Sequence, residues 1–276
     1  MPKKFFFIIY LLIILNSCSS NKETIYEPSI KINPYESYKA GMNAFEKNDY
    51  FFASKKFSEA ELNFEIPSLA AKSAIMSSYA LYGINFYNDA EENLNRYLEN
   101  YPGDKNVIYA HYLLAVIQFE QIGEEKHDLN PLIKAKKQID FFLTKYPNSE
   151  YAIDLNFKKD LVNNQFAAKE LYIAKYYIST QKWIPAINRL KLIVKDYEKT
   201  IFIEEALHRL VEIHYHMGLK DEANKYATIL GYNYNSGKWF EQSYKILNKN
   251  YEKVLKTKIR EEKNFLNKIF KAIKLR

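Results

Sequence analysis

The chain repeats one pattern of apolar and polar positions five times. In each copy an alanine opens the pattern, an apolar residue follows four positions later, and another follows three positions after that. The five copies are Ala53-Phe57-Ala60, Ala90-Leu94-Tyr97, Ala135-Ile139-Phe142, Ala186-Leu190-Ile193 and Ala223-Ala227-Leu230. Positions four and seven apart share one face of an α-helix. The pattern therefore predicts five helices that each bury one stripe.

Each of these helices is the second member of a predicted helix pair. In the first copy the turn between the two helices is Asn48-Asp49-Tyr50, and Gly41 is the small residue of the first helix at the crossing point. Backbones that approach to about 8 to 10 Å leave no room there for a large side chain. The anchor alanines are 37, 45, 51 and 37 residues apart, which indicates a unit of about 34 residues with insertions at 121–130 and 148–166.

This arrangement resembles the helix-turn-helix unit of the tetratricopeptide repeat. The 276 residues include only seven glycines and eight prolines, and so few turn-forming residues favour long helices over a many-stranded sheet. An irregular helical bundle is the alternative, because it would also show apolar residues at helical spacing. We predict an all-α fold, a tetratricopeptide-repeat superhelix of about five helix pairs plus a C-terminal helix.

The N-terminus has the layout of a secretory signal. Lys3 and Lys4 precede an uninterrupted apolar run over residues 5–15. This run of eleven residues covers about half of a ~30 Å hydrocarbon core, so a permanent membrane span is the weaker alternative. We predict a signal peptide over residues 1–17.

The only cysteine of the chain, Cys18, follows this signal directly. The segment Leu15-Asn16-Ser17-Cys18 resembles the lipobox of bacterial lipoproteins, in which the cysteine carries the lipid. The resemblance implies a lipid attached to Cys18 and a flexible tether over residues 18–32. Because Ser19 rather than aspartate follows the cysteine, it also implies an anchor in the outer membrane, with the protein facing the periplasm.

The net charge of +7 belongs to the C-terminal tail. Residues 249–276 contain ten Lys or Arg and three Glu, and outside this tail and the signal peptide the chain has 28 basic and 30 acidic residues. A near-neutral body argues against a nucleic-acid partner. The tail places Tyr251, Leu255, Ile259, Leu266, Ile269, Phe270 and Ile273 at helical spacing. We predict a basic amphipathic helix over 248–276 that caps the repeats, docks a partner or lies on anionic lipid.

The sequence shows no cluster of catalytic or metal-binding groups. His214 and His216 are two residues apart, so on a helix they point in nearly opposite directions and cannot share a metal. Glu204 and His208 share a face, but two residues do not complete a metal site. The scattered glycines form no phosphate-binding loop. We therefore expect a binding protein with no catalytic residues, no metal and no cofactor, and an enzyme such as an envelope hydrolase is the weakest alternative.

Aromatic residues gather on the inner face predicted for the first helices of repeats one and two. This face holds Tyr35, Tyr38, Met42, Phe45, Ile75, Tyr79 and Tyr82. As a set they predict a groove for an extended or helical peptide with apolar anchors, although packing between helices is an equal alternative for any single residue. The same face of the fifth repeat offers Glu205, His208, Glu212, Tyr215 and His216. We expect the two ends to bind different partners.

Several segments resemble the BamD family of β-barrel assembly lipoproteins over residues 33–247. They are Tyr146-Pro147-Asn148-Ser149-Glu150-Tyr151, Ala186-Ile187-Asn188-Arg189-Leu190 and Gly231-Tyr232-Asn233-Tyr234 followed by Trp239-Phe240, the last as in alphaproteobacterial members. The resemblance implies that N-terminal repeats one to three (33–147) receive unfolded outer-membrane barrel proteins. C-terminal repeats four and five (148–247) would bind a periplasmic POTRA domain of BamA.

The resemblance also implies which residues contact BamA. The family has a basic-Asp-Tyr-Pro turn after its fourth repeat, and here the turn reads Lys195-Asp196-Tyr197-Glu198. Arg189, Lys195, Asp196 and Tyr197 are the implied contacts, while Glu198 in place of proline raises the question of the shape of the turn. Other assembly-machine lipoproteins are possible partners. The alternative function is that of another envelope tetratricopeptide lipoprotein or adaptor, acting in cell division or peptidoglycan maintenance.

Overall fold

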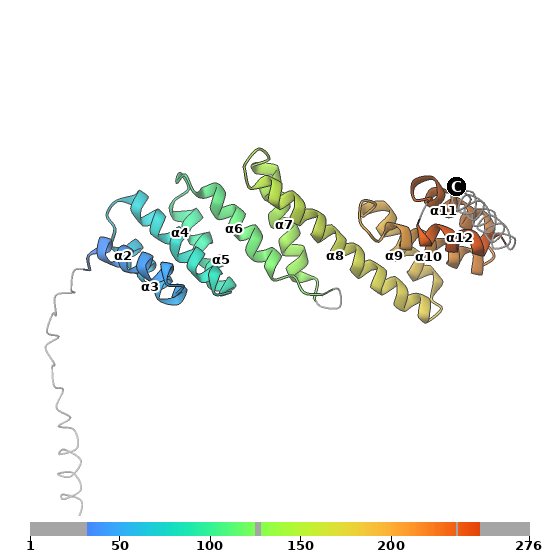
Figure 1. The fold of residues 1–276 in the computed structure, drawn as a ribbon, viewed down its shortest axis with the longest axis horizontal. Helices are drawn as coiled ribbons and strands as arrows, with labels where there is room; N and C mark the ends of the chain where they lie inside the picture. Colours follow the sequence, from blue (N-terminus) through green and yellow to red (C-terminus); the bar gives the residue numbers. More distant parts are fainter. Residues whose placement is uncertain (1–31, 125–127, 236, 249–276) are drawn as a thin grey trace, which may run out of the picture.

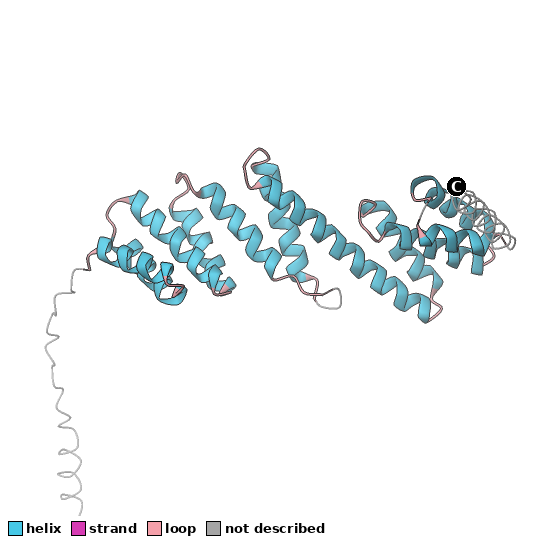
Figure 2. Ribbon diagram, in the orientation of Figure 1, coloured by secondary structure: helices cyan, strands magenta, loops and turns pink. Residues whose placement is uncertain are grey.

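The structure is a computed structural model that describes residues 32–124, 128–235 and 237–248. Within these residues the chain forms eleven α-helices and no strand (Figure 1, Figure 2). They are α2 (Pro34–Glu46), α3 (Tyr50–Asn63), α4 (Pro67–Gly83), α5 (Tyr87–Asn100), α6 (Val107–Glu120), α7 (Asn130–Lys145), α8 (Ala152–Ser179), α9 (Trp183–Asp196), α10 (Ile203–His216), α11 (Lys220–Asn233) and α12 (Lys238–Leu247). The predicted signal peptide, nearly all of the tether and the tail helix lie outside the described residues.

The helices pack as five successive pairs along an elongated body (Figure 1). The pairs are α2 with α3, α4 with α5, α6 with α7, α8 with α9, and α10 with α11. All five anchor alanines are fully buried: Ala53, Ala90, Ala135, Ala186 and Ala223 each have 0% exposure. The apolar residues that follow them also lie in the core. The predicted all-α fold of five helix pairs is confirmed.

The turns inside four of the pairs share one backbone conformation. Each contains a residue in the left-handed region, namely Asn48 (φ 61°), Asn85 (φ 61°), Gln181 (φ 57°) and Gly218 (φ 79°). In each case the next residue donates its N–H to the carbonyl five positions earlier, as Asp49 does to Ala44 at 2.9 Å. This is the Schellman arrangement that ends a helix. Asp49 then caps α3, because its carboxylate accepts the Phe52 N–H at 3.2 Å.

The crossing of α2 and α3 has no spare volume. A Cβ built on Gly41 would lie 2.8 Å from two ring carbons of Phe57, and Phe57 is fully buried. Gly83, at the end of α4, differs from Gly41, because its added Cβ would meet the Tyr50 ring at an ordinary 3.5 Å. Glycine is thus required at the first position and not at the second.

We expect Gly41→Ala to lower the free energy of unfolding by about 1 to 2 kcal/mol. Overpacking destabilises by about 1 to 3 kcal/mol, and the higher helix propensity of alanine compared with glycine offsets up to about 1 kcal/mol of this. The matched control Gly83→Ala should leave stability unchanged or raise it. Urea unfolding followed by circular dichroism measures both changes, and an equal effect of the two substitutions would show that the crossing tolerates a methyl group.

Helix α8 shows what the second predicted insertion does. Residues 148–166 add no loop to the repeat, because most of them extend α8 to 28 residues. In its first half, Leu155 and Val162 pack in the core with α6 and α7, whereas Ala167 and Leu171 in its second half pack with α9 and α10. The two halves of the molecule therefore share one continuous helix, and the N-terminal and C-terminal cores meet along α8.

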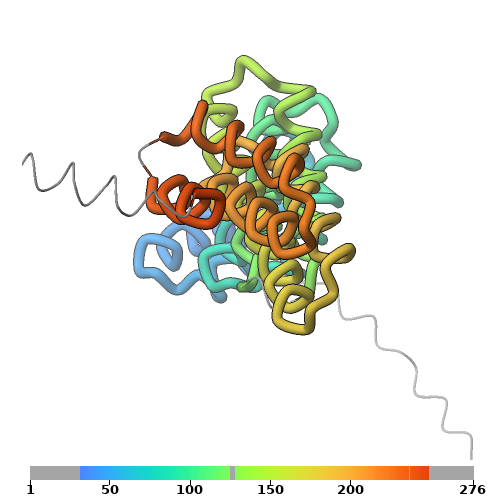
Figure 3. The backbone as a smooth tube through the Cα atoms, turned by 90° about the vertical axis from the view of Figure 1, so that its right-hand side faces the viewer, coloured from blue at the N-terminus to red at the C-terminus, as the bar shows by residue number. Residues whose placement is uncertain are grey.

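Helix α12 covers the C-terminal end of the last pair (Figure 3). The sequence pattern places this segment within the fifth repeat, but α12 packs across α10 and α11 as a separate helix. Its Ser243 hydroxyl is 2.9 Å from Nδ1 of His208 on α10, and the rings of Trp239 and His208 are 5.0 Å apart. A solenoid needs such a cover for its exposed end, so the described chain already carries a cap before the tail begins.

The contact between α10 and α12 should weaken at acidic pH. Burial lowers the pKa of His208, which is 4% exposed, and nearby Arg209 acts in the same direction while Glu212 and Glu205 oppose it. The unfolded chain, with a histidine pKa near 6.5, then binds more protons than the folded chain, so stability is lost as the pH falls through that value. We expect a lower melting temperature at pH 5 than at pH 7.5. In His208→Asn this pH-dependent difference should shrink, and an unchanged difference would assign it to other groups.

Candidate binding surfaces

Aromatic rings from the first helices of three successive pairs, and from the residue that precedes α8, form a continuous row. Ring centroids are 5.7 Å apart for Phe45 and Tyr79, 6.5 Å for Tyr79 and Tyr109, 5.8 Å for Tyr109 and Tyr151, and 4.6 Å for Tyr151 and Tyr112. We call these five residues the aromatic ladder. The first three rings come from α2, α4 and α6, the first helices of three pairs, and Tyr151 directly precedes α8. The ladder therefore runs along the same side of the N-terminal repeats.

The ladder presents aromatic ring surface together with uncharged tyrosine hydroxyl groups. Tyr79 is 38% exposed, and the other four residues are half-buried. Burial raises the pKa of Tyr109, and burial together with a hydrogen bond to Asp154 at 3.0 Å raises the pKa of Tyr112, so both hydroxyls stay protonated at neutral pH. Such a surface offers stacking to aromatic or aliphatic side chains and hydrogen bonds to a peptide backbone.

The seven predicted groove residues do not all reach this surface. Phe45 and Tyr79 belong to the ladder, and Tyr82 lies beside it, 6.1 Å from Tyr79. Tyr38 and Met42 are half-buried against the core around Phe57. Ile75 is 7% exposed and packs in the core of the second pair, so it cannot line a groove. Tyr35 is exposed, but its ring packs on Phe64 at the N-terminal edge.

Three ladder residues escaped the sequence prediction, namely Tyr109, Tyr112 and Tyr151. A usable signal was present, because tyrosines three residues apart recur at 35 and 38, at 79 and 82, and at 109 and 112. Residues three apart share a helix face. The insertion at 121–130 breaks the repeat spacing after α6 and conceals this third copy.

The predicted contact residues at the other end surround the turn after α9. Lys195 and Asp196 are exposed, and the Tyr197 ring stacks on Phe166 of α8 at 5.9 Å with an interplanar angle of 6°. Together with polar residues of α8 they line a hollow of ≈ 310 Å³. Arg189 lies two turns earlier on α9, where it pairs with Glu170 at 3.0 Å. The structure thus brings Lys195, Asp196 and Tyr197 together at one hollow. Arg189 does not line this hollow and is instead paired with α8.

Glu198 does not distort this turn. Tyr197 has φ −131° and ψ 33°, close to −128° and 50° for Tyr101 and −131° and 52° for Tyr146, which both precede proline. Thr200 donates its N–H to the Tyr197 carbonyl at 3.1 Å, and its hydroxyl donates to the same carbonyl at 2.7 Å. These two bonds close the turn without the restraint of a proline ring.

The polar face that the sequence predicts on the fifth pair is partly covered. His208 is covered by α12, as described above, and Glu205 is tied to Lys175 at 2.9 Å and to Arg209. His216 packs against Trp183 with ring centroids 5.2 Å apart. Because the Glu212 side chain is 42% exposed and His216 is exposed, this end offers polar groups on α10 as well as at the turn after α9.

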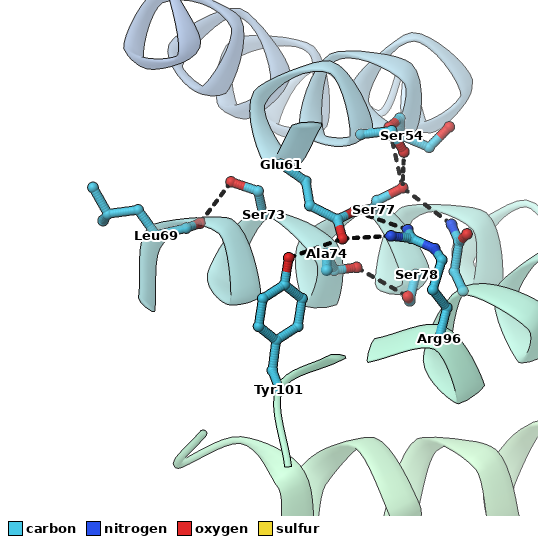
Figure 4. Close-up of polar contacts among 11 residues, drawn as sticks. Ser54, Glu61, Leu69, Ser73, Ala74, Ser77, Ser78, Arg96 and Tyr101 are labelled. Atoms are coloured by element: carbon cyan, nitrogen blue, oxygen red, sulfur yellow. Dashed lines mark hydrogen bonds and ion pairs between the residues drawn. The ribbon is translucent and has the colours of Figure 1, made fainter. Parts of the chain in front are cut away.

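A buried polar network joins the first two pairs (Figure 4). Glu61 on α3 is 5% exposed, and its carboxylate accepts a hydrogen bond from Arg96 of α5 at 2.8 Å as well as the ion pair with the second guanidinium nitrogen. Tyr101 donates to the same carboxylate at 3.3 Å. This pairing through two guanidinium nitrogens holds α5 in a fixed position relative to α3.

Other kinds of site are not seen in the part of the chain that the structure describes. No group of three or more His, Cys, Asp or Glu residues there is placed to hold a metal ion. Among the described helices, none combines the length and the apolar character needed to cross a bilayer.

Comparison with known proteins identifies the family. The family model described as YfiO, outer membrane lipoprotein, matches residues 31–229. The outer membrane protein assembly factor BamD of Rickettsia prowazekii is 32% identical over 242 residues, which cover 87% of this chain and 94% of the relative. The chain belongs to the BamD family.

A second alphaproteobacterial BamD agrees with this membership. BamD of Caulobacter vibrioides is 33% identical over 213 residues, or 77% of this chain and 70% of the relative. Among solved structures, PilW, a widely conserved type IV pilus biogenesis factor, covers 75% of this chain and 96% of its own with 13% identity. Its TM-score of 0.36 is too low to support an argument. The alphaproteobacterial type of BamD predicted from the sequence is confirmed.

Proposed function

We propose that the chain is an outer-membrane lipoprotein scaffold that helps β-barrel proteins to fold and insert. In this proposal Cys18 carries the lipid, the N-terminal repeats bind unfolded barrel proteins, and the C-terminal repeats bind a POTRA domain of BamA. No step of this work requires catalysis by the chain itself. The observation that carries the proposal is the aromatic ladder, because it provides a long surface that suits the aromatic-rich strands of unfolded barrel proteins.

The second surface supports a division of labour. The turn at Lys195, Asp196 and Tyr197 is charged, hollowed and built on α8 and α9, whereas the ladder ends at Tyr151 before α8 begins. Because α8 is continuous, the two surfaces keep a fixed spacing. A scaffold with this form can present a bound chain to BamA at a constant distance.

Co-purification tests the proposal. The lipoprotein, extracted with mild detergent from outer membranes, should come down with a BamA-type barrel, and depletion of the lipoprotein should lower the amount of barrel proteins in the membrane. Isolation of the chain alone under these conditions would contradict the proposal. Chaining or septal defects with normal barrel levels would instead support an envelope adaptor in cell division or peptidoglycan maintenance.

A further inference from the structure

A second groove lies away from the aromatic ladder, between α3 and α5. It has a volume of ≈ 640 Å³. Phe51 and Phe86 form one end, with their rings 6.2 Å apart and exposed fractions of 49% and 45%, and Leu62 forms the other end with 81% exposure. Large apolar side chains with this exposure at both ends of a groove indicate that the groove binds a further segment or partner.

The floor of this groove is polar and already organised. Ser77 of α4 donates to the Ser54 carbonyl at 3.1 Å and lies 2.9 Å from the Ser58 hydroxyl (Figure 4). Asn93 of α5 donates to Ser77 at 3.4 Å. Ser77 is fully buried, so the partly exposed Ser58 hydroxyl and Asn93 amide are the polar groups that face the groove. Placed between two apolar ends, they suit an extended peptide, whose backbone can hydrogen-bond to them while alternate side chains reach the ends.

The first described residue borders the groove. Ile32, the first described residue, lines the end beside Leu62. The residues before it read Ile25-Tyr26-Glu27-Pro28-Ser29-Ile30-Lys31, with apolar side chains at both ends of the segment. Six extended residues span about 20 Å, and the eleven helical steps from Leu62 to Phe51 span about 16 Å. Tyr26 is therefore able to reach Phe51 and Phe86.

We propose that the groove between α3 and α5 binds residues 25–31 of the same chain. Ile30 fits the Leu62 end, Tyr26 fits between Phe51 and Phe86, and Glu27 comes near Lys55, whose ammonium lies 4.4 Å from the centre of the Phe51 ring. Given the proposed lipid on Cys18, docking leaves only residues 18–24 free. The free tether then reaches roughly 23 Å instead of about 45 Å, which holds the first two repeats close to the membrane.

Disulfide trapping in the full-length lipoprotein tests this docking. Glu27→Cys and Lys55→Cys are combined, so that Tyr26, Phe51 and Phe86 stay in place. The protein is oxidised in detergent, and the rate of intramolecular crosslinking is compared with that of the parent and of the Glu27→Cys, Phe52→Cys pair. Phe52 lies on α3 close to Lys55 in sequence but does not line the groove, so an undocked tether would reach both positions. We expect the first pair to crosslink at least tenfold faster, and equal rates would overturn the proposal.

Two neighbouring phenylalanines give a matched control. Phe51 lines the groove, whereas Phe52 is 44% exposed but does not line it. Added to the Glu27→Cys, Lys55→Cys protein, Phe51→Asp should slow crosslinking about tenfold and Phe52→Asp should not. Equal effects of the two, or disulfide-linked dimers in place of the intramolecular bond, would refute the docking. None of these readouts depends on BamA or on barrel proteins, so they separate this inference from the proposed function.

Discussion

Replacement of Arg96 by methionine should lower the free energy of unfolding by about 3 kcal/mol or more, among the largest effects of any single substitution in the first two repeats. The reason is that the Glu61 side chain, which is 3% exposed, would lose its guanidinium partner and retain only the weak Tyr101 contact. Breaking a buried pair by removal of one partner costs more than the pair itself contributes, because the other charge loses its compensation. Urea unfolding measures the change.

Two further variants show whether the uncompensated charge is the cause. The double variant Arg96→Met, Glu61→Leu should recover most of the loss, since apolar residues often replace a buried ion pair at little cost. Lys56→Met, which leaves the carboxylate of Glu59 at 27% exposure and therefore in contact with water, should cost less than about 1 kcal/mol. A double variant that is less stable than Arg96→Met would show that the network stabilises the fold through the packing of its side chains rather than through charge compensation.

Replacement of Tyr79 and Tyr109 by serine should reduce the affinity for an unfolded barrel segment by about 30-fold or more. Each aromatic anchor in a contact surface is worth about 1 to 2 kcal/mol or more, and the two are adjacent in the ladder. Fluorescence anisotropy with a labelled peptide that ends in an aromatic barrel strand measures the change.

The control for this experiment replaces two exposed tyrosines that lie outside the ladder. Tyr172 and Tyr176 on α8 are 45% and 58% exposed, so their replacement by serine changes as much aromatic surface. We expect that pair to bind the peptide as well as the unmodified protein. Equal losses for both pairs would mean that binding is unspecific, and full affinity of the ladder variant would remove the ladder from the proposed function.

The sequence predicted the repeats because their signal is periodic. Each second helix has a small residue at the crossing and apolar residues four and seven positions later. This pattern can be detected within a single segment of the sequence, and Ala53 with Phe57 is the clearest case. The sequence also predicted the first turn at Asn48-Asp49-Tyr50, where Asn48 adopts the left-handed conformation that asparagine accepts with little strain. Features that one helix carries alone were therefore predictable.

Features that depend on contacts between distant helices were not. Glu61 and Arg96 are 35 residues apart, and nothing in either segment marks them as partners. Ile75 and Tyr79 are four residues apart on α4, yet one is in the core and the other is exposed, because the neighbouring helices determine which side is covered. The sequence placed His208 on an exposed face, but in the structure α12 packs on it.

Site-specific photocrosslinking in living cells tests the central claim most directly. A photoreactive residue at Tyr79 samples the aromatic ladder, and one at Lys195 samples the turn after α9. The account predicts that the Tyr79 position traps unfolded barrel proteins and that the Lys195 position traps BamA. The reverse pattern, or the same partner at both positions, would contradict a scaffold with two distinct binding surfaces.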